Sequence, residues 1–304
     1  MNTKAAVIDM GTNTFHLLVA EKRSDGTWKT LCRERRYVKL AENGIERIGA
    51  APFERAVQTM RFFRETIDAL GVPLSEVRTV GTAALRTAHN AGDLLDAMQQ
   101  ACGIRGEVIG GLREAELICK GVRQAVPWPA GRGLIMDIGG GSTEFIVADA
   151  EQVLWQHSFP LGASVLLNRF RPDDPITTLQ IAEIVQFLSG ELTSLWTALS
   201  AHPTHTLVGA SGTFDVIDQF LLDPATKPEN YGFVPVEVFH GLSQQFVHST
   251  RAERLAMSGL PEERVDMIVP AMLLIDVVLQ KAGIQHIYTS AYALKEGLMA
   301  ELLS

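Results

Sequence analysis

The chain has 304 residues, of which 46% are hydrophobic, 20% are charged and 7% are aromatic. This composition is that of a globular protein, and the length is about twice that of a usual single domain, so we expect two domains and exclude a small disulfide-stapled fold. The net charge of -8 excludes a protein that holds nucleic acid by bulk electrostatics, and any polyanion would approach residues 1–126, which carry 18 basic and 15 acidic side chains.

The first half of the chain has the alternating pattern of an α/β domain. Residues 5–10 and 17–20 are apolar and flank a short turn of Gly, Asn and Thr, which predicts a β-hairpin. Breakers cluster at residues 127–131, so we predict a linker there and domains of residues 1–126 and 127–304. Between hairpin and linker the periodicity predicts helices at 53–70, 92–101 and 112–123 and strands at 77–81 and 105–109.

The second half begins with another apolar hairpin, over residues 133–148 and continuing to about residue 159. A terminal helix is expected at about 291–303, after a short strand at 286–289. Between them the pattern predicts a long helix at 177–199, a strand at 205–208, and helices near 213–222, 236–256 and 262–282.

The two hairpins repeat each other. Asp9 aligns with Asp137, Gly11 with Gly139, and Thr14 with Ser142, and an apolar strand ending in Val-Ala follows each turn. An ordered set of matches this long indicates a duplicated half. Neither turn has the glycine spacing of a Walker loop or a dinucleotide site, but each offers backbone N–H groups beside small hydroxyls, so two facing turns would hold a phosphate from both sides.

Several polar residues beside these turns are open to two interpretations. Asp9 and Asp137 end their strands, where a carboxylate can hold a divalent cation or simply cap the turn. Glu144 is a second metal or water ligand, or a polar hairpin residue. Arg86 suits phosphate oxygens, or is a solvated arginine. Glu114 lies in a first helical turn, where a carboxylate is favoured in any case, and the local pattern alone favours that structural role.

Two further clusters have open interpretations. The run Gly209-Ala210-Ser211-Gly212-Thr213 is a strand-to-helix turn that suits either a ligand contact or close packing. The basic cluster at Arg33, Arg35, Arg36 and Lys39 is either a solvated strand face or part of an electrostatic funnel.

The motifs at residues 9–14 and 137–144 resemble the two phosphate motifs of the actin-like ATPase superfamily. More narrowly, the chain resembles the exopolyphosphatase/guanosine pentaphosphate phosphatase (Ppx/GppA) family over nearly its whole length. The supporting segments are 38–44, 81–90, 111–116, 209–213, 263–266 and 290–297.

The resemblance implies an α/β, duplicated actin-like (ribonuclease H-like) fold of two domains with an interdomain cleft, a terminal helix that packs back onto the first domain, and a homodimer. It implies that Glu114 is the catalytic carboxylate and that Mg²⁺ is the metal, and it leaves open whether K⁺ is an activator. The implied metal ligands are Asp137, Glu144 and Asp9. The implied phosphate-binding residues are Asn13, Thr14, Arg86, Gly139, Gly140, Gly141 and Ser142.

The activity that we expect from this resemblance is exopolyphosphatase: release of terminal orthophosphate from inorganic polyphosphate by Mg²⁺-assisted attack of water. The alternatives are a pppGpp 5'-phosphohydrolase and a sensor that binds polyphosphate, ppGpp or a nucleotide without hydrolysis. The family's Glu-Glu-Ala-Arg is Arg113-Glu114-Ala115-Glu116 here, so Glu114 is kept while its flanking charges are exchanged.

The sequence also predicts the compartment. Cys32, Cys102 and Cys119 are odd in number and lack metal-ligand spacing, which indicates reduced thiols in the cytoplasm. No stretch has the length and apolar character of a signal peptide or a membrane span, so we expect no membrane partner.

Overall fold

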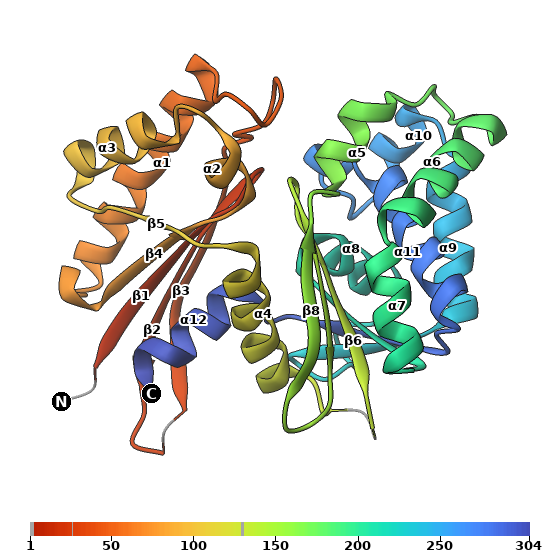
Figure 1. The fold of residues 1–304 in the computed structure, drawn as a ribbon. Coiled ribbons are helices and arrows are strands. Elements are labelled where there is room, and N and C mark those ends of the chain that lie inside the picture. The colour runs from red at the N-terminus through yellow and green to blue at the C-terminus, as the bar shows by residue number, and fades with distance from the viewer. Residues whose placement is uncertain (1–2, 26, 129–130) are drawn as a thin grey trace. The chain divides into compact units, whose positions relative to one another are not determined.

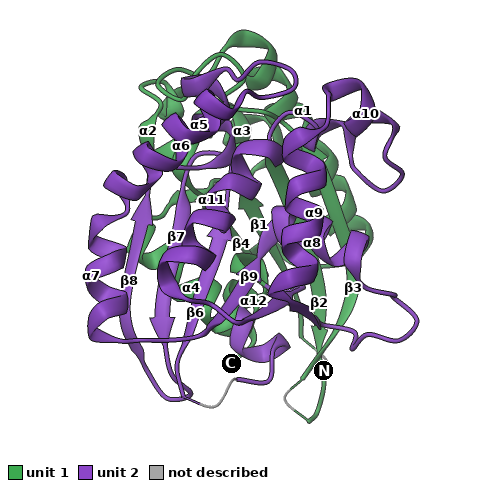
Figure 2. Ribbon diagram, turned by 90° about the vertical axis from the view of Figure 1, so that its right-hand side faces the viewer, with its two compact units in different colours: residues 1–121, 293–304 green, residues 122–292 purple. Residues whose placement is uncertain are grey.

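The computed structural model describes residues 3–25, 27–128 and 131–304, so that Pro129 and Ala130 of the predicted linker lie outside the described residues. The chain divides into two compact units (Figure 2): unit 1 comprises residues 1–121 and 293–304, and unit 2 comprises residues 122–292. The division falls inside helix α4 (Gly111–Ala125), a few residues before the boundary that the breaker cluster suggested. No helix in the described parts of the chain is both long and apolar enough to span a lipid bilayer.

Unit 1 is built on a five-stranded sheet of order β3-β2-β1-β4-β5 (Figure 1). β1, β2 and β3 form an antiparallel meander, and β4 and β5 continue the sheet in parallel with β1. The strands are β1 (Lys4–Met10), β2 (Thr14–Lys22), β3 (Trp28–Tyr37), β4 (Val77–Gly81) and β5 (Glu107–Val108).

Helices cover both faces of this sheet, because residues 5–8 of β1 are all buried and successive side chains of a strand point to opposite faces. Ala6 and Ile8 face a core formed with α1 (Ala50–Ala69) and α3 (Ala91–Cys102). On the other face, α12 (Leu294–Leu303) packs against β1 and β2. Glu301 of α12 is paired with Arg113 and Lys120 of α4. The 3-10 turn η1 (Leu74–Glu76) follows α1, and the short helix α2 (Ala83–Thr87) follows β4.

Unit 2 contains a six-stranded sheet of order β10-β11-β9-β6-β7-β8. Its helix α11 (Ile268–Ala282) is apolar on nearly all sides and is buried among α5, α6, α7 and α9, as an all-round apolar helix must be. The strands are β6 (Gly133–Ile138), β7 (Thr143–Ala148), β8 (Val153–Phe159), β9 (Thr206–Ala210), β10 (Tyr231–Pro235) and β11 (His286–Ser290). The other helices are α5 (Ala163–Phe170), α6 (Thr178–Glu191), α7 (Thr193–Ala201), α8 (Ser211–Leu221), α9 (Val236–His248), α10 (Arg251–Ala256) and the 3-10 turn η2 (Glu262–Arg264).

The repeat in the sequence is a repeat in the structure. Asp9 lies opposite His16 in the β1–β2 register, and Asp137 lies opposite Glu144 in the β6–β7 register, so the two hairpins pair at equivalent residues. Each hairpin is followed by a third antiparallel strand. The first strand of each hairpin also has a parallel neighbour: β4 lies beside β1, and β9 lies beside β6. The expected duplication of an α/β half is therefore confirmed.

Two predicted helices are each divided in the structure. The helix expected at 177–199 ends at Glu191 and restarts at Thr193, whose hydroxyl donates to the carbonyl of Gly190 at 2.6 Å. The helix expected at 236–256 ends at His248, because Thr250 starts a new helix as its N-cap, with its hydroxyl accepting from the backbone N–H of Glu253. In both places a threonine hydroxyl satisfies backbone groups that helix continuation would otherwise satisfy.

Candidate active site

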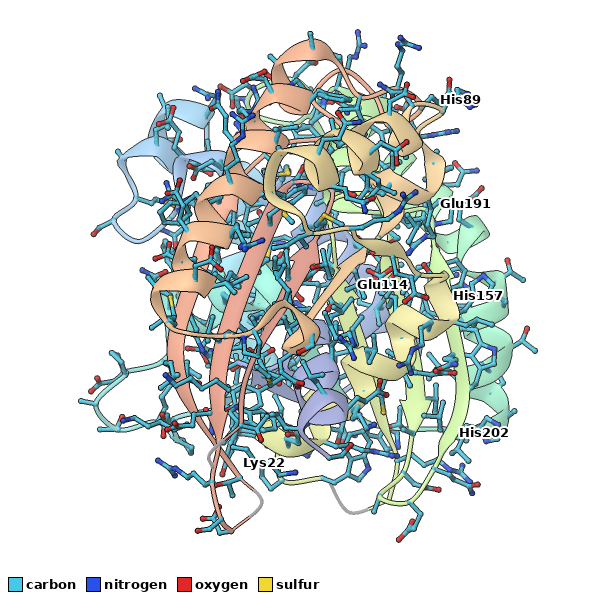
Figure 3. The ribbon with its side chains drawn as sticks, turned by 90° about the vertical axis from the view of Figure 1, so that its left-hand side faces the viewer. Lys22, His89, Glu114, His157, Glu191 and His202 are labelled. Carbon is cyan, nitrogen blue, oxygen red and sulfur yellow. The ribbon has the colours of Figure 1, made fainter. Side chains whose placement is uncertain are left out.

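Glu114 lies on the first turn of α4 and is buried, with 7% of its surface exposed (Figure 3). Its Oε2 accepts a hydrogen bond of 2.6 Å from Arg86 Nη1, which also donates to the backbone carbonyl of Ile109 at 3.0 Å. Arg86 lies on α2 after β4, whereas Glu114 lies just after β5. Since β4 and β5 are parallel neighbours, the segments after them start at the same edge of the sheet, and this topology pairs two residues 28 positions apart.

This pairing gives the carboxylate a fixed direction. Arg86 is anchored at one nitrogen to both a carboxylate and a backbone carbonyl, so the carboxylate is held against the end of β5. The start of a helix also favours a negative charge. A carboxylate that is oriented and largely shielded from bulk water is suited to positioning a water molecule and accepting its proton.

The turn between β1 and β2 is clamped from one side. Gly11 N–H donates to the Thr14 carbonyl at 3.1 Å and closes the turn, and a Cβ at Gly11 would lie 2.9 Å from that same oxygen. The Asn13 carbonyl accepts from the N–H groups of Val38 and Lys39, both at 2.9 Å. The carbonyl side of the turn is therefore occupied by the segment that follows β3.

The turn between β6 and β7 is built in the same way. Gly139 N–H donates to the Ser142 carbonyl at 3.0 Å. The carbonyls of Gly139 and Gly140 accept from the N–H groups of Ala163 and Ser164 at 2.9 and 3.0 Å, where the segment after β8 enters α5. A Cβ at Gly162 would lie 2.3 Å from the Gly140 oxygen, so only glycine allows this approach. In both repeats the turn carbonyls bond to the segment after the third strand.

Asp137 is buried at the end of β6 and its Oδ2 accepts a hydrogen bond of 2.7 Å from the Ser211 hydroxyl. Ser211 is the first residue of α8 and has a φ of 65°, a left-handed conformation that is uncommon outside glycine. Such a backbone persists only where its surroundings enforce it, and it is concentrated at functional sites. The sequence singled out this turn but not Ser211 as a partner of Asp137.

Glu144 is 1% exposed and accepts hydrogen bonds from the hydroxyls of Ser142 and Ser158, both at 2.7 Å. Ser158 lies opposite Glu144 in the β7–β8 register, so the strand pairing itself creates this contact. Ser142 belongs to the predicted phosphate turn. Glu144 therefore fixes the direction of the Ser142 hydroxyl.

The donor set of unit 2 is compatible with Mg²⁺. Asp137 and Glu144 are register partners, so their carboxylates lie on the same face of adjacent strands. Within each unit, the described residues contain no group of three or more His, Cys, Asp or Glu side chains that could hold a metal ion by themselves. Mg²⁺ commonly takes one or two protein carboxylates and completes its shell with water and substrate phosphate. These residues therefore fit Mg²⁺ that is bound together with a phosphate group.

The structure groups the sequence-predicted residues in three places. In unit 1, Arg86 contacts Glu114, and Asp9, Asn13 and Thr14 lie at the first hairpin turn. In unit 2, the second hairpin holds Asp137, Gly139, Gly140, Gly141, Ser142 and Glu144. Sequence reasoning missed Ser158, Gly162 and the contact of Ser211 with Asp137.

Known proteins resemble the chain over almost its full length. Residues 18–304 match the model of the Ppx/GppA phosphatase family. An exopolyphosphatase from Cytophaga hutchinsonii ATCC 33406 is 37% identical, with a TM-score of 0.94 and coverage of 99% of this chain and 98% of that one. An exopolyphosphatase-like protein is 26% identical, with a TM-score of 0.89 and coverage of 99% and 97%.

A more distant structure supports the fold alone. The PPX-GPPA enzyme of Aquifex aeolicus is 24% identical, has a TM-score of 0.82, and is matched over 99% of this chain and 100% of that one. Taken with the hairpin repeat and the paired Glu114, the family match over residues 18–304 identifies the chain as a member of the Ppx/GppA phosphatase family, a hydrolase of phosphoanhydride bonds with a duplicated actin-like α/β fold.

Proposed function

We propose that this protein is an exopolyphosphatase, which releases terminal orthophosphate from inorganic polyphosphate by Mg²⁺-assisted attack of water. The observation that carries the proposal is the buried Glu114 held by Arg86 at 2.6 Å, because a hydrolase needs an oriented carboxylate for its water and a binding protein does not. The likeness to the exopolyphosphatase of Cytophaga hutchinsonii supports the choice of substrate.

Glu114 orients a water molecule and takes its proton as the water oxygen attacks the terminal phosphorus. The new P–O bond forms while the bridging P–O bond breaks, and the shortened chain leaves with the electron pair of that bond. Phosphoryl transfer requires positioning and charge neutralisation more than covalent chemistry. Arg86 keeps the carboxylate directed and brings a positive charge beside the reacting phosphate.

The two hairpin turns bind phosphate oxygens. Because the carbonyls of Asn13, Gly139 and Gly140 are engaged elsewhere, the side that receives an anion consists of backbone N–H groups of the turns other than those of Gly11 and Gly139, which close the turns. The hydroxyl proton of Ser142 is donated to Glu144, so Ser142 would bind phosphate through its backbone N–H, and Thr14 holds the equivalent position in the other repeat.

Asp137, with Glu144 beside it, would hold Mg²⁺, and Asp9 is the equivalent residue of the first repeat. When bound, the ion neutralises charge on the phosphate oxygens. Ser211 acts through Asp137, because its hydroxyl fixes the direction of that carboxylate.

The test is orthophosphate release, with Mg²⁺, from short-chain polyphosphate, long-chain polyphosphate and pppGpp side by side. Glu114→Gln should keep the fold and phosphate binding but lose about 100-fold or more of turnover, the usual contribution of a general base. Glu116→Gln is the matched control, since it removes an exposed carboxylate two positions along the same helix and should leave turnover unchanged.

Three outcomes would contradict the proposal in different ways. Faster release from pppGpp than from either polyphosphate would make the protein a pppGpp phosphohydrolase. Turnover that survives Glu114→Gln would remove that residue from the mechanism. Tight binding of all three compounds without Glu114-dependent release would identify a sensor.

A further inference from the structure

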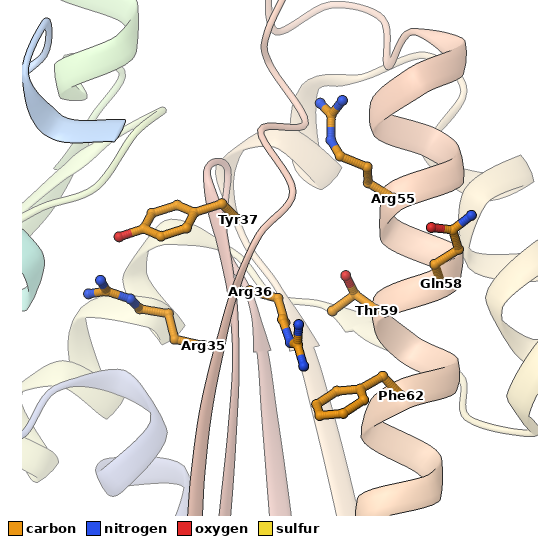
Figure 4. A pocket seen from close by; sticks show the side chains of 7 residues that line it. All are labelled: Arg35, Arg36, Tyr37, Arg55, Gln58, Thr59 and Phe62. Carbon is orange, nitrogen blue, oxygen red and sulfur yellow. The ribbon is translucent and has the colours of Figure 1, made fainter. Parts of the chain in front are cut away.

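Unit 1 contains a pocket of about 470 Å³ between the end of β3 and helix α1, and its charged side chains are basic (Figure 4). Three arginines line it, Arg35 and Arg36 from β3 and Arg55 from α1, and its lining contains no carboxylate. Arg36 points toward α1, whereas Arg35 and Tyr37 project from the other side of β3 (Figure 4). The volume is in the range of ligand sites.

The guanidinium groups of Arg35 and Arg36 are held by aromatic rings and not by acids. Arg36 lies over the Phe62 ring at 4.0 Å and Arg35 over the Tyr37 ring at 5.0 Å. Over the part of the chain that the structure describes, neither guanidinium has a hydrogen-bond or ion-pair partner. When a guanidinium stacks on an aromatic ring, its N–H groups point outward in the plane of the guanidinium. They can then donate hydrogen bonds to an anion.

Arg55 gives the pocket a fixed wall. Its Nε donates to the carbonyl of Val38 at 2.9 Å, and its Nη2 is paired with Glu42. The backbone that Arg55 grips is the segment that clamps the first phosphate turn, since the Val38 N–H donates to the Asn13 carbonyl. The pocket and the turn are therefore parts of one hydrogen-bonded assembly.

The strand register places the pocket directly beside that turn. Thr14, the last residue of the turn, lies opposite Tyr37, and Phe15 lies opposite Arg36. An anionic chain whose end occupied the turn would meet these arginines next. The pocket thus continues the phosphate-binding surface of unit 1 along β3.

The chemistry of the pocket selects phosphate groups over a nucleobase. Planar guanidinium donors match phosphate oxygens, and Arg36 covers the Phe62 face on which a base would otherwise stack. We propose that Arg35, Arg36 and Arg55 form a subsite for the internal phosphates of a polyphosphate chain, beyond the end that is hydrolysed. This inference rests on the proposed function, because it assumes that a polyphosphate end occupies the turn.

The first test compares kcat and KM for tripolyphosphate and long-chain polyphosphate in Arg36→Gln. A lost charge-assisted hydrogen bond should raise KM for the long chain about tenfold or more, with kcat unchanged, while both constants for tripolyphosphate stay within about twofold of the original protein. Arg61→Gln, which removes an exposed arginine of α1 outside the pocket, is the matched control and should change neither substrate. An unchanged long-chain KM, or an equal change for tripolyphosphate, would overturn the subsite.

The second test separates the subsite from the proposed function. Long-chain polyphosphate is titrated calorimetrically into Glu114→Gln and into Glu114→Gln/Arg36→Gln, and the dissociation constant should rise about tenfold or more in the double variant. This binding readout applies even if the protein fails to hydrolyse polyphosphate. Pyrophosphate that bound as tightly as the long chain, with the same dependence on Arg36, would identify a separate small anion as the occupant and overturn the assignment.

Discussion

Alanine in place of Gly297 is expected to destabilise unit 1, because α4 and α12 cross with their backbones in contact. A Cβ at Gly297 would lie 1.9 Å from the Leu117 oxygen and 3.1 Å from the Gly121 nitrogen. A Cβ at Gly121 would in turn lie 2.0 Å from the Ala293 oxygen. All of these neighbours are main-chain atoms of α4 or of Ala293, which immediately precedes α12, and they cannot rotate away as a side chain would, so the two helices must separate.

The size of the effect follows from this geometry. Overpacking costs about 1–3 kcal/mol where side chains can adjust, and a clash with backbone on both sides of the crossing places Gly297→Ala at about 3 kcal/mol. For a unit of this size, that corresponds to a fall of roughly 10 °C in the midpoint of thermal unfolding. Circular dichroism at increasing temperature measures the midpoint directly.

The matched control is Gly92→Ala in α3 of the same unit, where a Cβ would meet no atom within 4 Å. Alanine favours the helix and restricts the unfolded chain there, so this variant should be as stable as the original protein or more stable by up to about 1 kcal/mol. Should Gly297→Ala unfold at or above the temperature of the original protein, the close crossing of α4 and α12 would be refuted.

Burial raises the pKa of Glu301, but its hydrogen bonds to two basic side chains of α4 outweigh this and hold the pKa below its usual 4.5. The ionised carboxylate therefore stabilises the fold at pH values above 4.5. Glu301→Gln should lower the free energy of unfolding in urea by about 1 kcal/mol near pH 7, and this difference should vanish as the pH falls through the lowered pKa. Ser211→Gly suits the left-handed backbone but removes the hydroxyl that orients Asp137; orthophosphate release should fall about tenfold at an unchanged melting temperature, and full activity would exclude the contact from the mechanism. Arg86→Lys keeps the charge but loses the planar guanidinium whose Nη1 reaches both Glu114 and the Ile109 carbonyl, so kcat should drop about tenfold or more in the same assay, whereas equal activity would mean that charge alone suffices.

The local sequence pattern predicts those helices and strands whose formation depends mainly on residues close to them in the chain. Both hairpins were predictable because apolar strands flank turns rich in glycine and small polar residues, and the structure pairs them at equivalent residues. Strand β10 (Tyr231–Pro235) was missed, because it contains a glycine and a proline and exists through pairing with the distant β11. Helix α5 was missed as well, since its start depends on the approach of Gly162 to the Gly140 carbonyl.

The site shows the same division between local and distant information. The position of Glu114 in a first helical turn is local, and it was predicted; its burial against Arg86 depends on the parallel pairing of β4 and β5, which the helical pattern does not encode. For Glu144, the sequence left open a metal ligand, a water ligand or a hairpin residue. Glu144 accepts hydrogen bonds from the hydroxyls of Ser142 and Ser158, and the bond from Ser158 depends on the β7–β8 register. From the sequence, only the resemblance to a family assigns Glu114 and Glu144 their expected roles.

The return of α12 to unit 1 determines the order in which the protein can be completed during synthesis. All of unit 2, residues 122–292, leaves the ribosome before residues 293–304, which unit 1 needs to cover one face of its sheet. Domains generally fold in the order of their synthesis, but here the unit that is begun first is finished last. Until α12 arrives, the face of β1 that carries Ala5 and Val7, both buried in the finished protein, lacks its cover, and the nascent chain presents an apolar sheet surface that is prone to aggregate.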